Sequence, residues 1–259
     1  MKKAIYLSIL ALITVGCIIW RVGVDAFGWF SAHDTISAHD TILNESQNMT
    51  DGAETLDAFS GLNVETDTMD VTVQQGKEYG ISYEVAEKDA FQYSLENGTL
   101  TITQKHPKHW IGGVYMRSAQ VTVTVPDDAK LDDVDITASV GDVSVRGIIT
   151  ENFFCELDTG DFTAENARLG DSTINADVGN VTLKKVLTKD LNVTSDVGDV
   201  DASLAGAEKD YNVTLEADVG NATLNGEHVR KSTRMDAPDA DFDIDISADV
   251  GDIALTFAE

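Results

Sequence analysis

The chain has 259 residues, of which 42% are hydrophobic, so it has room for a large core. It carries 45 acidic and 18 basic residues, and its formal charge of -27 argues against nucleic-acid binding, for which clustered lysines and arginines would be expected. Cations or cationic partners are easier to accommodate. The two cysteines cannot form a disulfide framework: Cys17 lies in an apolar N-terminal run and Cys155 is expected to be a core residue.

Residues 1–21 are predicted to be a transmembrane anchor. Two lysines precede an uncharged, largely apolar run from Ala4 to Trp20, which Arg21 closes. Such a run is at the short end of what crosses a bilayer as a helix, and the lysines place the N-terminus in the cytoplasm. A cleaved signal peptide and lipidation of Cys17 are the alternatives. We therefore expect a single-pass protein of the cell membrane with most of its chain outside the cytoplasm.

Residues 22–57 are predicted to be a stalk, with a tandem copy of the hexapeptide SAHDTI at 31–36 and 37–42. Residues 58–130 then form an irregular β-rich cap, with strand-like segments and an Asn97-Gly98 hairpin signal. This cap interrupts its strands with a basic and aromatic segment that contains His106, His109 and Trp110. The segment is either an irregular connection or a contact site for a partner or a sugar.

Residues 131–259 contain an internal repeat that is centred on a glycine. The repeated stretch is Ala-Asp-Val-Gly-Asn-Val at 176–181, and the first steps between glycines are 19 residues, followed by 22 and 31. Almost all residues seven and five positions before the glycines, and two and four positions after them, are apolar, with Ser172 as the exception. The buried face therefore changes parity at the glycine. The predicted corner glycines are Gly141, Gly160, Gly179, Gly198, Gly220 and Gly251.

Each repeat is therefore predicted to be two short strands that meet at a bend. Glycine suits the bend because it needs a backbone conformation, or a close approach, that a Cβ would hinder. One such unit cannot bury its own apolar face, whereas a stack of them can. We predict an all-β fold, a parallel β-solenoid with about 19 residues per coil. The alternative is a chain of antiparallel hairpins, which would show the same alternation of apolar and polar residues.

Three segments carry a more specific resemblance: residues 120–126 (QVTVTVP), 131–136 (LDDVDI) and 139–145 (SVGDVSV), together with the glycine ladder that follows. Over residues 58 to 259 the chain resembles the bacterial putative-adhesin family of β-strand-repeat envelope proteins, a domain of unknown function. The resemblance implies a right-handed parallel β-solenoid in the cell envelope, often linked with envelope-stress systems. It implies no catalytic residues. The last two repeats of this chain depart from the family in their irregular spacing.

Acidic residues recur two positions before and one position after the glycines, except at Ser139, Asn180 and Asn221. Stacked coils would place like residues about 4.8 Å apart, where two carboxylates in water repel by about 0.9 kcal/mol. A divalent cation would relieve this repulsion, so calcium is a candidate ligand of the column two residues before the glycine. Turn chemistry is the alternative, because Asp and Asn favour bends through local hydrogen bonds. The candidate metal ligands are Asp158, Asp177, Asp196, Asp218 and Asp249.

Motifs for hydrolases, metalloproteases and nucleotide-binding enzymes are missing from the sequence. We therefore predict that the protein is not an enzyme but a membrane-anchored adhesion or envelope-interaction module, with an envelope protein or a polysaccharide as partner. The expected working surfaces are the acidic corner and the segment around Trp110. The alternative is a β-helix protein that cleaves or binds polysaccharide, which rests on analogy between folds.

Overall fold

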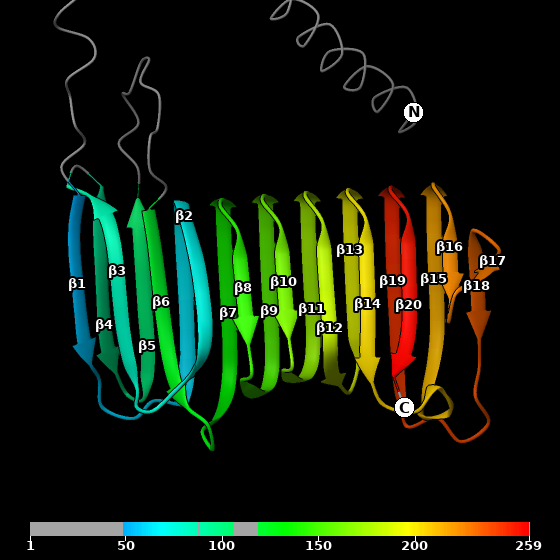
Figure 1. Ribbon diagram of the computed structural model, residues 1–259, viewed down its shortest axis with the longest axis horizontal. Helices are drawn as coiled ribbons and strands as arrows, with labels where there is room; N and C mark the ends of the chain where they lie inside the picture. Colours follow the sequence, from blue (N-terminus) through cyan, green and yellow to red (C-terminus); the bar gives the residue numbers. More distant parts are fainter. Residues whose placement is uncertain (1–48, 88, 106–118, 259) are drawn as a thin grey trace, which may run out of the picture. The chain divides into compact units, whose positions relative to one another are not determined.

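The computed structural model describes residues 49–87, 89–105 and 119–258, and this part of the chain is almost entirely β-strand (Figure 1). All of it belongs to one compact unit, residues 47–259. No helix among these residues is long and apolar enough to cross a membrane. The predicted anchor and the histidine hexapeptides lie outside the described residues.

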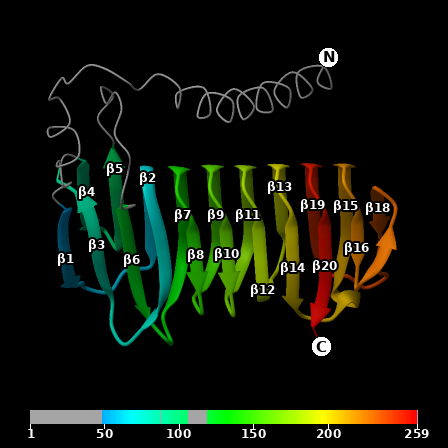
Figure 2. The same ribbon diagram turned by 45° about the horizontal axis from the view of Figure 1, so that its top comes forward.

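The strands form two sheets, named A and B, whose strands lie side by side in a long stack (Figures 1 and 2). Within the stack, neighbouring coils pair in parallel, as the solenoid prediction requires, and antiparallel pairs occur at its two ends. In spatial order, sheet B consists of β4 (Ala90–Glu96), β5 (Thr99–Lys105), the first half of β2 (Gly61–Gly76), β7 (Lys130–Val140), β9 (Ile149–Thr159), β11 (Arg168–Val178), β13 (Leu191–Val197), β19 (Phe242–Val250), β15 (Tyr211–Val219) and β18 (Ser232–Met235). Sheet A consists of β1 (Met49–Thr55), β3 (Gly80–Ala86), β6 (Ala119–Pro126), the second half of β2, β8 (Val143–Arg146), β10 (Phe162–Glu165), β12 (Val181–Thr188), β14 (Val200–Ala205), β20 (Ile253–Ala258), β16 (Ala222–Leu224) and β17 (Glu227–Val229). The 3-10 turn Glu208–Asp210 precedes β15.

The core lies between the two sheets and is built from the predicted apolar columns. In the coil around Gly141, for example, Val134 and Ile136 of β7 and Val143 and Val145 of β8 are all buried. Equivalent residues of successive coils pair in register, so each column becomes a continuous apolar row. Cys155 is a buried free thiol in one of these rows, and burial raises its pKa far above the usual value. It is therefore a core residue, as the sequence indicates.

The order of coils in space differs from their order in the sequence. The C-terminal strands β19 and β20, red in Figure 1, lie between β13/β14 and β15/β16. Ile244 of β19 pairs with Leu191 on one side and with Val213 on the other. The C-terminal coil is thus an interior coil, covered by the preceding one. Phe257 packs against Tyr211 of this covering coil, with their ring centroids 5.6 Å apart.

Two predicted domain boundaries need correction. The stalk was expected to extend to residue 57, yet Met49–Thr55 is strand β1, which pairs antiparallel with β3. The cap was expected to extend to residue 130, yet β2, β5 and β6 pair in parallel with the coils of the stack. The capping strands proper are β1, β3 and β4 at one end and β17 and β18 at the other. The Asn97-Gly98 turn joins β4 to β5 with positive φ angles of 52° and 79°, as its sequence predicts.

Candidate interaction surface

The predicted glycines lie where the chain passes from sheet B to sheet A. At Gly179 the φ angle is +148°, and a Cβ built there would lie 1.9 Å from the carbonyl oxygen of Gly160 in the neighbouring coil. Both a special backbone conformation and a close approach therefore require glycine at this position. The other corner glycines repeat this geometry, with φ from 143° to 158° and a neighbouring carbonyl oxygen at 1.8 to 2.3 Å: Gly141, Gly160, Gly198, Gly220 and Gly251.

A ladder of side-chain to backbone hydrogen bonds runs along the residues that follow the glycines. The backbone N–H of Asn180 donates to Oδ1 of Asp161 at 2.8 Å, and the N–H of Asp199 donates to Oδ1 of Asn180 at 3.0 Å. The same bond joins the other coils in spatial order, and the remaining acceptors are Asp70, Asp142, Asp199 and Asp252. Asp and Asn are interchangeable here because only an oxygen acceptor is needed. This acidic column thus stabilises the contact between coils.

The column two residues before the glycines consists of carboxylates beside the ladder. Asp158, Asp177 and Asp218 are exposed, while Asp196 and Asp249 are partly buried. Burial raises the pKa of Asp196, and the neighbouring charges of Asp177 and Asp249 raise it further. Asp249 neighbours Asp196 because of the inserted C-terminal coil. The column is therefore an outward-facing line of like charges.

The described residues contain no group of three or more His, Cys, Asp or Glu side chains arranged to hold a metal ion. Each of the five candidate aspartates therefore has at most part of a coordination shell from its neighbours. Calcium binding by Asp158, Asp177, Asp196, Asp218 and Asp249 stays a prediction, and water would have to supply further ligands, since calcium takes six to eight oxygens.

An exposed valine row lies between the two acidic columns, and the sequence-based interpretation missed it. The residues one position before the glycines continue the alternation of apolar residues along the strand, but the bend turns them towards solvent. Val140 and Val178 are each 49% exposed, Val197 is 44% exposed and Val219 is 61% exposed. Residue pairing places the row in the order Val140, Thr159, Val178, Val197, Val250 and Val219. The acidic columns and the valine row together are called the corner ridge below.

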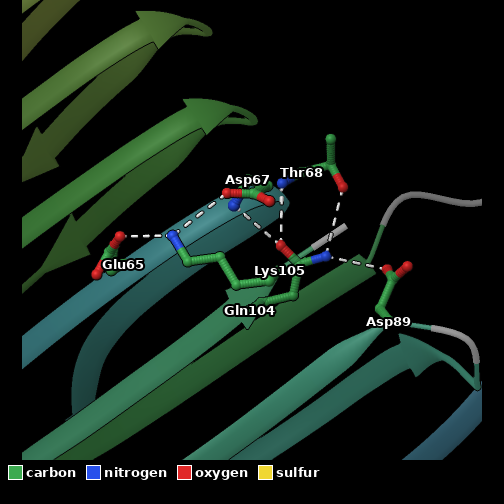
Figure 3. A network of polar contacts seen from close by, with 6 residues as sticks. All are labelled: Glu65, Asp67, Thr68, Asp89, Gln104 and Lys105. Carbon is green, nitrogen blue, oxygen red and sulfur yellow. Dashed lines mark hydrogen bonds and ion pairs between the residues drawn. The ribbon is translucent and has the colours of Figure 1, made fainter. Parts of the chain in front are cut away.

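The ladder ends at β2, which passes the corner with Met69 in place of glycine. There the buried side chain of Gln104 accepts hydrogen bonds from the backbone N–H groups of Asp67 and Thr68, both at 3.0 Å (Figure 3). Its amide nitrogen donates to Oδ2 of Asp89 at 3.0 Å. One oxygen of Gln104, Oε1, thus accepts from both N–H groups near the end of β5.

The predicted partner-binding residues His106, His109 and Trp110 lie outside the described residues. The flanking strands β5 and β6 both pair with β2 close to its corner. Gln104 of β5 pairs with Thr66, and Ala119 of β6 pairs with Met69. The described strands on either side of this segment therefore meet β2 at one end of the corner ridge.

The polysaccharide-cleaving alternative requires a groove with two carboxylates facing each other. Two described cavities lie at the ends of the stack and have carboxylates in their walls. One, of about 930 Å³, lies beside Tyr211 and Phe257 and includes Glu208 and Asp236. The other, of about 550 Å³, lies beside Tyr93 and includes Glu54 and Asp57. The phenol of Tyr93 donates to Oε2 of Glu54 at 2.5 Å, and this hydrogen bond raises the pKa of Tyr93 to about 12.

The fold and the corner define an all-β solenoid-like protein whose repeated feature is a glycine bend bordered by acidic columns. Residues 59–258 match the family described as Toastrack DUF4097, and the chain belongs to this family. The match confirms the resemblance to a family of putative adhesins of unknown function. None of the curated proteins compared with the chain is detectably similar to it.

Several solved structures match the chain at low sequence identity. A putative cell adhesion protein from Clostridium sporogenes has a TM-score of 0.49 and 15% identity, with 82% of this chain and 100% of that chain covered. A putative adhesin from Bacteroides fragilis has a TM-score of 0.41 and 11% identity, with 82% and 98% covered. A putative adhesin from Parabacteroides distasonis has a TM-score of 0.38 and 11% identity, also with 82% and 98% covered.

Proposed function

We propose that this protein is a non-catalytic adhesion or envelope-interaction module that binds a cationic partner through its corner ridge. One observation carries the proposal: the fold repeats the same acidic, solvent-facing corner in register from coil to coil. From four residues before each glycine to three residues after it, the sequence contains no lysine or arginine. A surface with charges of one sign attracts oppositely charged partners and repels others.

The cellular setting is part of the same proposal. The apolar run from Ala4 to Trp20 would hold the chain in the cell membrane, with the solenoid outside the cytoplasm. A role in the envelope-stress response, a right-handed coil and a polysaccharide partner also remain proposals.

Binding to isolated bacterial envelopes tests the proposed function. The fragment 47–259 is suitable because it forms one compact unit that contains every residue of the described core. We expect saturable, salt-sensitive binding that is lost when four ridge carboxylates are neutralised. The ridge variant carries Asp158→Asn, Asp177→Asn, Asp196→Asn and Asp249→Asn.

A matched control neutralises the same number of exposed carboxylates away from the ridge and should bind as the parent does. The control carries Asp128→Asn, Asp171→Asn, Glu227→Gln and Asp239→Asn, all at exposed positions. Equal binding by both variants would refute a role for the ridge. Release of new reducing ends from envelope polysaccharide would instead support the enzymatic alternative.

Calcium is tested separately by calorimetric titration of the same fragment. A saturable heat that disappears in the double variant Asp177→Asn/Asp196→Asn would make the column a metal site. No response beyond that of matched ionic strength would leave these aspartates as partner-facing charges without a cofactor.

A further inference from the structure

The valine row has no partner within the described structure, although apolar side chains normally avoid such exposure when they form a continuous line. Val178 and Val197 pair in register and are each nearly half exposed, so two exposed apolar side chains lie next to each other in adjacent coils. The bend itself does not require an apolar residue at this position, because Thr159 occupies it in one coil of the same row. The row is thus an apolar strip with an acidic column on each side.

We propose that the valine row is the docking face for an amphipathic helix of a partner protein, with an apolar stripe bordered on both sides by lysine or arginine. The inference rests on the proposed function and specifies its partner. Charge complementarity selects this occupant, because the ridge offers carboxylates on both sides of the row and no basic residue. A second copy of the ridge, an anionic membrane surface and a nucleic acid would all be repelled.

The spacing of the row favours a helix over an extended segment. Successive coils are about 4.8 Å apart, and a helix presents one side of its surface about every 5.4 Å. An extended strand along the same line would present same-side residues about every 6.6 Å. The five steps from Val140 to Val219 span about 24 Å, the length of a helix of about 16 residues.

The geometry also places the flanking charges within reach of such a helix. One acidic column is the residue before each valine, except that Ser139 precedes Val140. The other column follows just beyond the glycine and is acidic except at Asn180 and Asn221. Lysine and arginine side chains on either side of the apolar stripe of such a helix are long and flexible, so their charged ends can reach beyond the stripe to the aspartates. Apolar contact would hold the helix on the row, and the aspartates would set its orientation.

The test is fluorescence anisotropy with fragment 47–259 and a labelled 16-residue probe of leucine and lysine whose leucines form one helical stripe. A scrambled peptide of identical composition is the control ligand. The variant Val178→Ser/Val197→Ser removes two steps of the row, and Leu187→Ser removes an exposed apolar residue, 39% exposed, outside it. Because all three positions are exposed, far-UV circular dichroism and thermal melting should show folded variants.

We expect the amphipathic probe to bind at least about tenfold more tightly than the scrambled peptide, and the valine variant to lose about tenfold in affinity while Leu187→Ser loses none. Equal, salt-sensitive binding of both peptides, unchanged in the valine variant, would overturn the inference but leave an acidic ridge that binds cations generally, as the proposed function requires. No binding of either peptide would overturn the inference, and envelope binding would then decide the proposed function alone. Displacement of the probe by residues 1–48 in the full chain would also overturn it, because the row would then belong to the chain itself.

Discussion

Replacement of Gly179 by alanine tests why the corner requires glycine. The new Cβ would lie 1.9 Å from the carbonyl oxygen of Gly160, whereas ordinary contacts lie at 3.4–4 Å, so the backbones of two coils would have to separate. Such overpacking costs about 1–3 kcal/mol, and a φ of +148° adds about 1–3 kcal/mol for a residue with a Cβ. We expect a loss of about 4 kcal/mol in the free energy of unfolding and a melting temperature roughly 8–16 °C lower.

Two further glycines separate the two causes. Gly98 has a φ of +79° and nothing within 4 Å of its built Cβ, so Gly98→Ala reports the cost of φ alone. Gly170 lies outside the positive-φ glycines, but its Cβ would lie 1.9 Å from the carbonyl oxygen of Glu151, so Gly170→Ala reports the steric cost alone. Urea denaturation of fragment 47–259 measures all three variants. If Gly179→Ala proves no more destabilising than Gly98→Ala, close approach of the coils is not the reason for the ladder.

Substitutions at Gln104, Asp161 and Asp196 test the polar and charged side chains of the corner. Gln104→Leu leaves the N–H groups of Asp67 and Thr68 without their acceptor. Urea denaturation should show a loss of about 2–5 kcal/mol in the free energy of unfolding. The control Gln120→Leu, at an exposed position, should cost little. Asp161→Ala removes the acceptor for the N–H of Asn180 and should cost about 1 kcal/mol, but Asp161→Asn should be nearly neutral; equal losses would contradict the ladder. Because the pKa of Asp196 is raised in the folded state, its protonation favours folding, and its contribution to stability falls as pH rises above the usual value of 3.8. Asp196→Asn should therefore flatten the dependence of melting temperature on pH just above that value and raise stability at pH 7. An unchanged profile would argue against a pKa of Asp196 raised by burial and by repulsion from Asp177 and Asp249.

Local chemistry accounts for what the sequence determined. The alternation of apolar residues, its change of parity at each glycine and the turn at Asn97-Gly98 are properties of a few consecutive residues. They were enough to predict an all-β stack, its corner and its core columns, including buried Cys155. The same pattern could not reveal that the valines before the glycines face solvent, because exposure there depends on the angle of the bend and not on the period.

The order of the coils was decided only by the tertiary structure. The inward columns of the last two repeats are both apolar, so Val213 and Ile244 can each stack on Leu191 without a change in local preference. A periodic sequence therefore determines the conformation of each coil but not which other coil it stacks against. The 31-residue step from Gly220 to Gly251 contains β17 and β18, and these strands cover the outer coil while the chain returns to the gap beside β13. The buried acceptor of Gln104 is likewise set by tertiary contact, since it lies 36 residues from Thr68 in the sequence.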